Sequence, residues 1–101
     1  MTAHGELWLV AADKPRPAIV LTRDPIARFL DGVLVAPVTT TVRGLAVEVP
    51  VTAADGLRRP SVANLDQVQR LDRSAFLHRL GQVRASTMRE ICAALHLAVD
   101  C

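Results

Sequence analysis

Two short apolar runs, each associated with proline, most restrict what this chain can fold into. Residues 18–21 and 33–38 are too short for typical helices and end at polar residues, a pattern that favours buried β-strands. Arg16 lies between Pro15 and Pro17, and a residue that precedes proline is held in extended geometry. We therefore expect a mainly β fold in which one strand begins directly after a rigidly mounted arginine.

Further strands are expected where short apolar or alternating segments are separated by turn residues. They fall at residues 5–11 and 45–51, as a short pair within 61–69, and at 80–84. Short helices are expected at 25–30, after an Asp-Pro start signal, and from about 71 to 79. Pro37 lies inside an apolar run, and because proline cannot donate to a β-ladder, we expect it at a sheet edge or a bulge.

The C-terminal segment has the pattern of an amphipathic α-helix. Ser86 or Thr87 can cap its start, and Thr87 and Glu90 have the spacing of a capping box. An apolar stripe follows at helical spacing, formed by Met88, Ile91, Cys92, Leu95 and Val99. We expect this face to pack against the sheet, with Cys92 as a small core residue.

Composition places the chain among ordinary globular proteins. Its 101 residues suffice for a single domain, residues 1–101, whose core needs no disulfide or metal. The net charge of +2 is too small to indicate an anionic partner by itself. No apolar run approaches about 20 residues and no signal peptide is apparent, so we expect a cytoplasmic protein without membrane contact. Cys92 and Cys101 lack metal-ligand spacing, so neither a zinc site nor another cofactor is expected.

Arg16 and a row of threonines are candidates for binding an oxyanion. The apolar run at 33–38 ends in three threonines, residues 39–41. If the strands at 18–21 and 33–38 are neighbours, they bring these hydroxyls and the Arg16 guanidinium to the same end of the sheet. Both groups donate hydrogen bonds to phosphate oxygens. The sequence therefore predicts a phosphate or other oxyanion site at this end.

Five segments, in order, cover nearly the whole chain and resemble the MazF/PemK family of bacterial toxins. They are Gly5-Glu6-Leu7-Trp8, Arg16 to Leu21, Val35 to Thr39, residues 60–62 with 66–68, and Leu80-Gly81 with Ser86-Thr87-Met88. The resemblance implies a mainly β, SH3-like small barrel with a C-terminal α-helix, acting as a homodimer. It also implies a metal-independent endoribonuclease that cuts single-stranded RNA at short motifs and is silenced by a cognate antitoxin protein.

The resemblance assigns roles to individual residues. The family's arginine of the Arg-Pro pair falls on Arg16, and its active-site threonine falls on Thr39. An aspartate that some members use falls on Asp66, whereas the arginine that they carry two residues earlier is replaced by Asn64. The first loop is reduced to residues 12–15, with no counterpart of the acidic or histidine residues that other members place there. The general base therefore stays unassigned.

Other residues are expected to contact RNA. Thr40, Thr41 and Gln67 neighbour the matched residues and are candidates for catalytic or RNA-binding roles. Four cations in expected turns or loops are candidates for holding the RNA backbone, namely Lys14, Arg43, Arg58 and Arg59. In most proteins such cations are simply solvated side chains on the surface.

The implied chemistry can be divided among these residues. The 2′-hydroxyl of the RNA would attack the adjacent phosphorus and leave a 2′,3′-cyclic phosphate and a 5′-hydroxyl. Such a step needs a base, charge stabilisation at phosphorus and a proton for the leaving oxygen. Arginine, with a pKa above about 12, suits charge stabilisation better than acid catalysis, so Arg16 would clamp the phosphate. Thr39 would orient it by a hydrogen bond.

Simpler interpretations and other functions stay open at this point. Arg16 could form a surface salt bridge to Asp13 or Asp24, and Thr39 could be an ordinary strand-end hydroxyl. A toxin of the same fold could bind and poison DNA gyrase without nuclease activity, and a plain SH3-like module could only bind a partner. The nuclease hypothesis predicts that Arg16→Ala abolishes RNA cutting while the fold stays intact.

Overall fold

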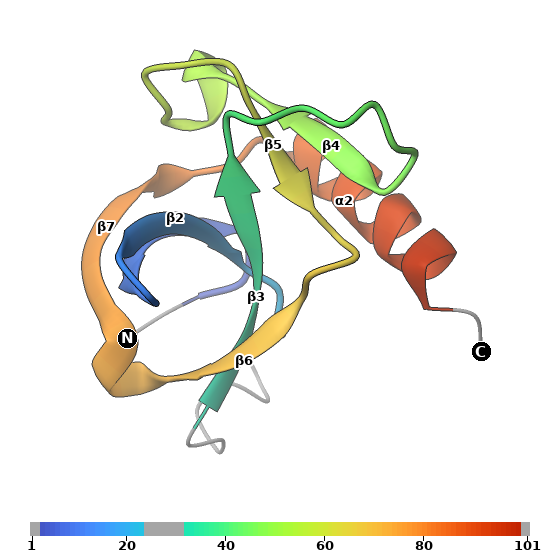
Figure 1. Cartoon of the computed structure of the whole chain (residues 1–101). Coiled ribbons are helices and arrows are strands. Elements are labelled where there is room, and N and C mark those ends of the chain that lie inside the picture. The colour runs from blue at the N-terminus through green and yellow to red at the C-terminus, as the bar shows by residue number, and fades with distance from the viewer. Residues whose placement is uncertain (1–2, 24–31, 100–101) are drawn as a thin grey trace.

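The computed structural model describes residues 3–23 and 32–99, which form a curved antiparallel sheet with one helix beside it (Figure 1). The strands are β1 (Glu6–Ala11), β2 (Pro15–Val20), β3 (Gly32–Thr39), β4 (Glu48–Val51), β5 (Ser61–Asn64), β6 (Gln69–Asp72) and β7 (Phe76–Gln82). Two 3-10 turns, η1 (Ala53–Asp55) and η2 (Arg73–Ala75), and helix α2 (Ala85–Ala98) complete the elements. The expected mainly β fold with a C-terminal helix is confirmed, and the helix expected at 25–30 lies outside the described residues.

β3 is the central strand of the sheet. The strand order is β4-β5-β3-β2-β1-β7, and β6 also pairs with β3. One side of β3 pairs with β2, and its other side pairs first with β6 as far as Val35 and then with β5 from Val38 onwards. Pro37 lies in the gap between these two partners, so its missing N–H interrupts no ladder there. Pro37 thus has no ladder partner on this side, as its lack of an N–H requires, but it lies at a change of partner within a central strand and not at a sheet edge or a bulge as expected.

Alternation along β2 and β3 divides the core into two clusters. Ala18, Val20, Val33 and Val35 lie in one cluster with Val10, against which Trp8, Leu71 and Phe76 pack. Ile19, Ala36 and Val38 belong to the larger cluster on the other face, with Leu7, Leu65 and the buried face of α2. The Trp8 and Phe76 rings meet edge to face with centroids 5.7 Å apart, so this tryptophan packs against the smaller core cluster.

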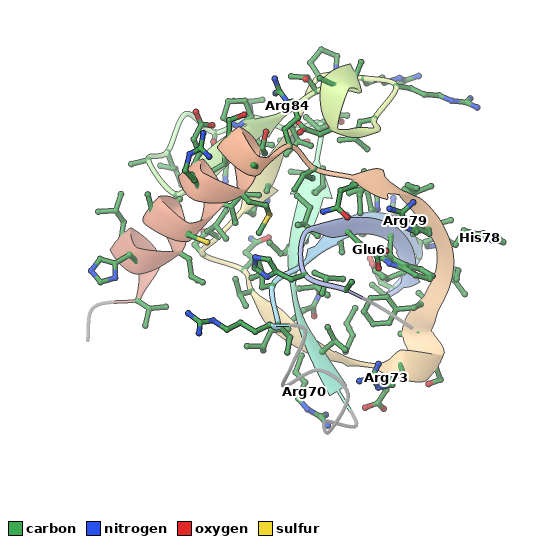
Figure 2. The ribbon with its side chains drawn as sticks, turned by 180° about the vertical axis from the view of Figure 1, so that it is seen from behind. Glu6, Arg70, Arg73, His78, Arg79 and Arg84 are labelled. Atoms are coloured by element: carbon green, nitrogen blue, oxygen red, sulfur yellow. The ribbon has the colours of Figure 1, made fainter. Side chains whose placement is uncertain are left out.

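The segment from 71 to 82 differs from the sequence expectation. In place of a helix ending near residue 79, the single turn η2 is followed by β7, which starts at Phe76 and ends at Gln82, so the strand expected at 80–84 is only the last part of a longer strand and stops two residues early. β7 pairs along β1, and Arg79 donates to Glu6 across this pair with Nε and Oε2 2.7 Å apart (Figure 2). Local propensity predicted a helix here because strand preference depends on cross-strand partners that are distant in sequence. The strand expected at 45–51 likewise begins only at Glu48.

α2 begins earlier than expected, and its buried face matches the expected stripe at Met88 and Ile91, with Leu95 packed beside them, but not at Cys92 or Val99. Its N-cap is Arg84, so Ser86 and Thr87 do not cap it, and the expected capping box is wrong. Thr87, Met88, Ile91 and Ala94 form its buried face, whereas Cys92 is exposed and is not a core residue. Within residues 3–23 and 32–99, no helix has the length and apolar character needed to cross a membrane.

Candidate functional site

Arg16 and Thr39 lie in one groove because of the register of β2 and β3. Ala18 pairs with Pro37, and continuing this antiparallel register by two residues sets Arg16 across from Thr39. The face that buries Ala18 therefore ends, beyond the core, in the side chains of Arg16, Pro37 and Thr39. The sequence prediction that the two strands bring these groups to one end of the sheet is confirmed.

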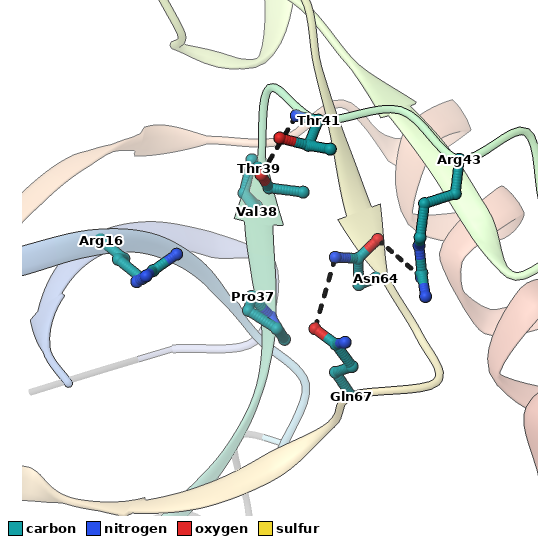
Figure 3. Close-up of a pocket in the computed structure, with 8 residues that line it drawn as sticks. All are labelled: Arg16, Pro37, Val38, Thr39, Thr41, Arg43, Asn64 and Gln67. Atoms are coloured by element: carbon teal, nitrogen blue, oxygen red, sulfur yellow. Dashed lines mark hydrogen bonds between the residues drawn. The ribbon is translucent and has the colours of Figure 1, made fainter. Parts of the chain in front are cut away.

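Two hollows meet at Arg16, and together we call them the groove. The first has a volume of about 210 Å³ and is lined by Arg16, Pro37, Val38, Thr39, Thr41, Arg43, Asn64 and Gln67 (Figure 3). The second, of about 450 Å³, is lined by Ala12, Asp13, Arg16, Pro37, Gln67 and Gln69. Arg16, Pro37 and Gln67 belong to both, so the groove continues past the arginine on either side.

Arg16 is held by Asp13, which lies in the turn between β1 and β2. Its Nε and Nη2 donate to the two carboxylate oxygens at 3.0 and 3.1 Å, and 41% of its side chain is exposed. These hydrogen bonds raise the pKa of Arg16 and lower that of Asp13. The simple interpretation of Arg16 as a surface ion pair thus describes the resting state. Because exposed ion pairs are weak, an incoming phosphate can replace the carboxylate at small cost.

Thr39 has a hydroxyl that is oriented by the chain that follows it. The backbone N–H of Thr41 donates to Thr39 Oγ1 at 3.1 Å. In this contact the Thr39 oxygen is the acceptor and uses one of its lone pairs. The hydrogen of the hydroxyl is not used there and can be donated to another group. Thr39 can therefore donate a hydrogen bond into the groove, and Thr41 lines the groove beside it.

Arg43 is the second cation of the groove, and carboxylates fix it from two sides. Its guanidinium donates to Glu48 Oε2 at 3.0 Å and to both oxygens of Asp66 at 2.9 and 3.1 Å. The Glu48 side chain is only 2% exposed and also accepts from the backbone N–H groups of Arg43 and Leu45. Asp66, followed by Glu48, raises the pKa of Arg43, and the Arg43 hydrogen bonds lower the pKa of Asp66. Asp66 is thus an ion-paired carboxylate that holds Arg43.

Asn64 connects Arg43 to Gln67 across the floor of the first hollow (Figure 3). Its Oδ1 accepts from Arg43 Nη2 at 3.3 Å, and its Nδ2 donates to Gln67 Oε1 at 3.5 Å. Asn64 is 5% exposed. The sequence indicated only that an arginine is missing at this position, whereas the structure brings the guanidinium of Arg43 to it from the β3–β4 loop.

Several predicted residues lie outside the groove, and others were missed. Lys14, Thr40, Arg58 and Arg59 are exposed and line neither hollow. The sequence offered Asp13 only as a salt-bridge partner of Arg16, which the structure confirms, and did not identify it as a residue that lines the groove. Gln69, which begins β6 two residues after Gln67 and lines the second hollow, was missed.

The positive charge in the groove is carried by two arginine side chains. Arg16 and Arg43 are both cations at neutral pH. Among residues 3–23 and 32–99, no group of three or more His, Cys, Asp or Glu side chains is placed to hold a metal ion. The fold and the groove define a small β-protein whose site presents two guanidinium groups and threonine hydroxyls, the donor set of an oxyanion-binding protein.

Comparison with known proteins identifies the family. Residues 3–99 match the family described as PemK-like, MazF-like toxin of type II toxin-antitoxin system. The probable endoribonuclease MazF5 of Mycobacterium tuberculosis (strain ATCC 25618 / H37Rv) is 43% identical over 104 residues, which cover 100% of this chain and 95% of that protein. The chain therefore belongs to the PemK/MazF toxin family, and the resemblance found in its sequence is confirmed.

Solved structures agree with this assignment. The Mycobacterium tuberculosis toxin MazF-mt6 superposes with a TM-score of 0.87 at 40% identity, covering 92% of this chain and 94% of that one. The MazE-MazF structure (Form-I) from Deinococcus radiodurans superposes with a TM-score of 0.82 at 26% identity, covering 95% of this chain and 93% of that one. These relatives give no support to a gyrase-binding toxin.

Proposed function

We propose that this protein is the toxin of a type II toxin–antitoxin system and acts as an endoribonuclease that cuts single-stranded RNA at short sequence motifs. Relatives at 43% identity over almost the whole chain are named as endoribonucleases. The observation that carries the proposal is the placement of Arg16 and Thr39 in one groove, together with a second fixed cation, Arg43. RNA brings one anionic phosphate per nucleotide to such a site.

The proposed reaction requires no metal. The 2′-oxygen forms a bond to the adjacent phosphorus and loses its proton, the bond from phosphorus to the 5′-oxygen breaks, and that oxygen gains a proton. The products are a 2′,3′-cyclic phosphate and a 5′-hydroxyl. Negative charge grows on the non-bridging oxygens, where preorganised donors lower the barrier most. Arg16 and the Thr39 hydroxyl are the donors that we assign to these oxygens.

Arg16 acts by charge and geometry in this proposal. Its pKa is raised further by Asp13, so it is a poor proton donor, while its planar fork matches two phosphate oxygens. When RNA enters, the phosphate takes the place of the Asp13 carboxylate. Arg43 holds a neighbouring phosphate or base, and Asp66 with Glu48 keeps its guanidinium in position. Asp66 is therefore assigned as a positioning residue.

The same proposal includes the partners and the cellular site. We infer that a cognate antitoxin protein binds this chain and blocks the groove, since the Deinococcus radiodurans relative of the same fold was solved as MazE-MazF. We also infer a homodimer, as the family resemblance implies, and exposed apolar side chains such as Leu97 and Val42, 66% and 63% exposed, are candidates for contact with a second copy. The activity belongs in the cytoplasm, where RNA is translated.

The test compares purified wild type with Arg16→Ala on a long defined RNA in excess EDTA, followed by mapping of the cut ends. We expect cuts at a recurring motif with 5′-hydroxyl ends, and a rate at least about a hundredfold lower in the variant. Arg70→Ala is the matched control, since Arg70 is also exposed and ion-paired but lies outside the groove. Two results would overturn the proposal: intact RNA from folded, antitoxin-free wild type, or equal cutting rates for wild type and Arg16→Ala.

A further inference from the structure

The second hollow of the groove has the size and lining of a separate binding site. Its volume of about 450 Å³ exceeds that of the first hollow, about 210 Å³. It extends from Arg16 towards Gln69, where β6 begins. Apart from Arg16, the residues that would hold the phosphate lie in the first hollow. The second hollow is therefore free to hold a different part of the substrate.

Two glutamines line this hollow, one from the turn before β6 and one from the first residue of β6. Gln67 and Gln69 both line it, whereas Val68 between them points the other way and packs against the larger core cluster. The packing of Val68 thus anchors the chain between the two glutamines. Ala12 and Pro37 add apolar surface, so the hollow offers both flat walls and polar groups.

The two carboxamides differ in what they have left to bind. Gln67 accepts from Asn64 through its Oε1, which leaves its NH2 group directed elsewhere. Across residues 3–23 and 32–99, no hydrogen bond occupies the carboxamide of Gln69. A free carboxamide presents an acceptor beside donors, which is the complement of a base edge that carries a donor beside an acceptor. Bases of single-stranded RNA are recognised on such edges.

We propose that the second hollow is a base-recognition subsite in which Gln69 reads the nucleotide next to the cleaved phosphate. Arg16 lies at the border of the two hollows, so a phosphate that it binds has this subsite directly on one side. The inference rests on the proposed ribonuclease function and adds to it the residue that sets one position of the RNA motif. Gln69 is a specificity residue here and takes no part in bond breaking.

The experiment compares the cut sites of wild type, Gln69→Ala and Gln69→Glu on a pool of long RNAs. In Gln69→Ala we expect base preference to disappear at one position beside the cut, with cutting of the best wild-type site reduced about 5- to 100-fold. In Gln69→Glu the side chain only accepts, so preference should move towards bases with an exocyclic amino group and away from uracil. Gln82→Ala, at an exposed glutamine of β7, is the matched control.

The outcomes separate the subsite from the ribonuclease function. If wild type cuts RNA but both Gln69 variants keep its motif and relative rates, the subsite proposal is overturned and the ribonuclease proposal stands. If the variants keep the motif but are no longer inhibited by the antitoxin, the hollow is a protein contact and the proposal is also overturned. If wild type cuts no RNA, the ribonuclease proposal is overturned, and the subsite proposal is overturned with it.

Discussion

Replacing Asp55 with asparagine should destabilise the fold in a way that depends on pH. Asp55 belongs to η1, is 0% exposed, and accepts hydrogen bonds from Arg84 at the start of α2 and from the Thr87 hydroxyl. Figure 2 labels Arg84 at this junction. Burial raises the pKa of Asp55, but the hydrogen bonds from Arg84, from the Thr52 N–H and from Thr87 outweigh it and lower the pKa from 3.8 to about 2. The ionised carboxylate thus ties the start of α2 to η1, and protonation weakens these contacts.

The pKa difference gives the magnitude of the effect. A fall from 3.8 to about 2 corresponds to about 2 to 3 kcal/mol of stability supplied by the ionised group. Because the folded pKa is the lower one, this stability is present above pH about 4 and is lost as the pH falls towards 2. Asp55→Asn should therefore lower the free energy of unfolding by about 2 to 3 kcal/mol at pH 7, and the difference from wild type should shrink in acid.

Urea unfolding of wild type and Asp55→Asn between pH 2 and 7 measures this difference. Protein concentration is held fixed, because association of subunits contributes to apparent stability. Asp72→Asn is the control, since Asp72 is exposed and its contact with Arg70 is long at 3.5 Å, so a change below about 1 kcal/mol is expected. A difference between wild type and Asp55→Asn that stays constant over the whole pH range would refute the reasoning.

Three further predictions concern the groove. Asp13→Asn frees Arg16 and should tighten binding of an RNA with a 2′-deoxynucleotide at the cut site several-fold, measured by fluorescence anisotropy; weaker binding would contradict this. Glu48→Gln loosens Arg43 and should raise KM more than it lowers kcat, so steady-state kinetics with unchanged KM would count against it. Thr39→Val should lower the cutting rate about 10-fold or more at unchanged melting temperature, and Thr39→Ser should restore most of it; equal rates for wild type and Thr39→Val would remove the hydroxyl from the mechanism.

The sequence by itself determined the parts of this protein that depend on local pattern. Alternating and apolar runs located β1, β3 and the buried part of β2, because side-chain period and burial act over a few residues. β2 itself begins before Arg16, at Pro15, and not after it as expected. The order of these strands then brought Arg16 and Thr39 to the same end of the sheet. The family resemblance came from the same segments, and it was correct for the fold.

Only the tertiary structure decided which distant residues complete the groove and hold the helix. Arg43 meets Asp66 from 23 residues away, and Asp55 meets Thr87 from 32 residues away. The start of α2 and the extent of β7 were mispredicted for the same reason, since a distant carboxylate bonds to Arg84 and β1 supplies the partner of β7. Local pattern has no access to such contacts, because their free energy arises only after the chain has brought the partners together.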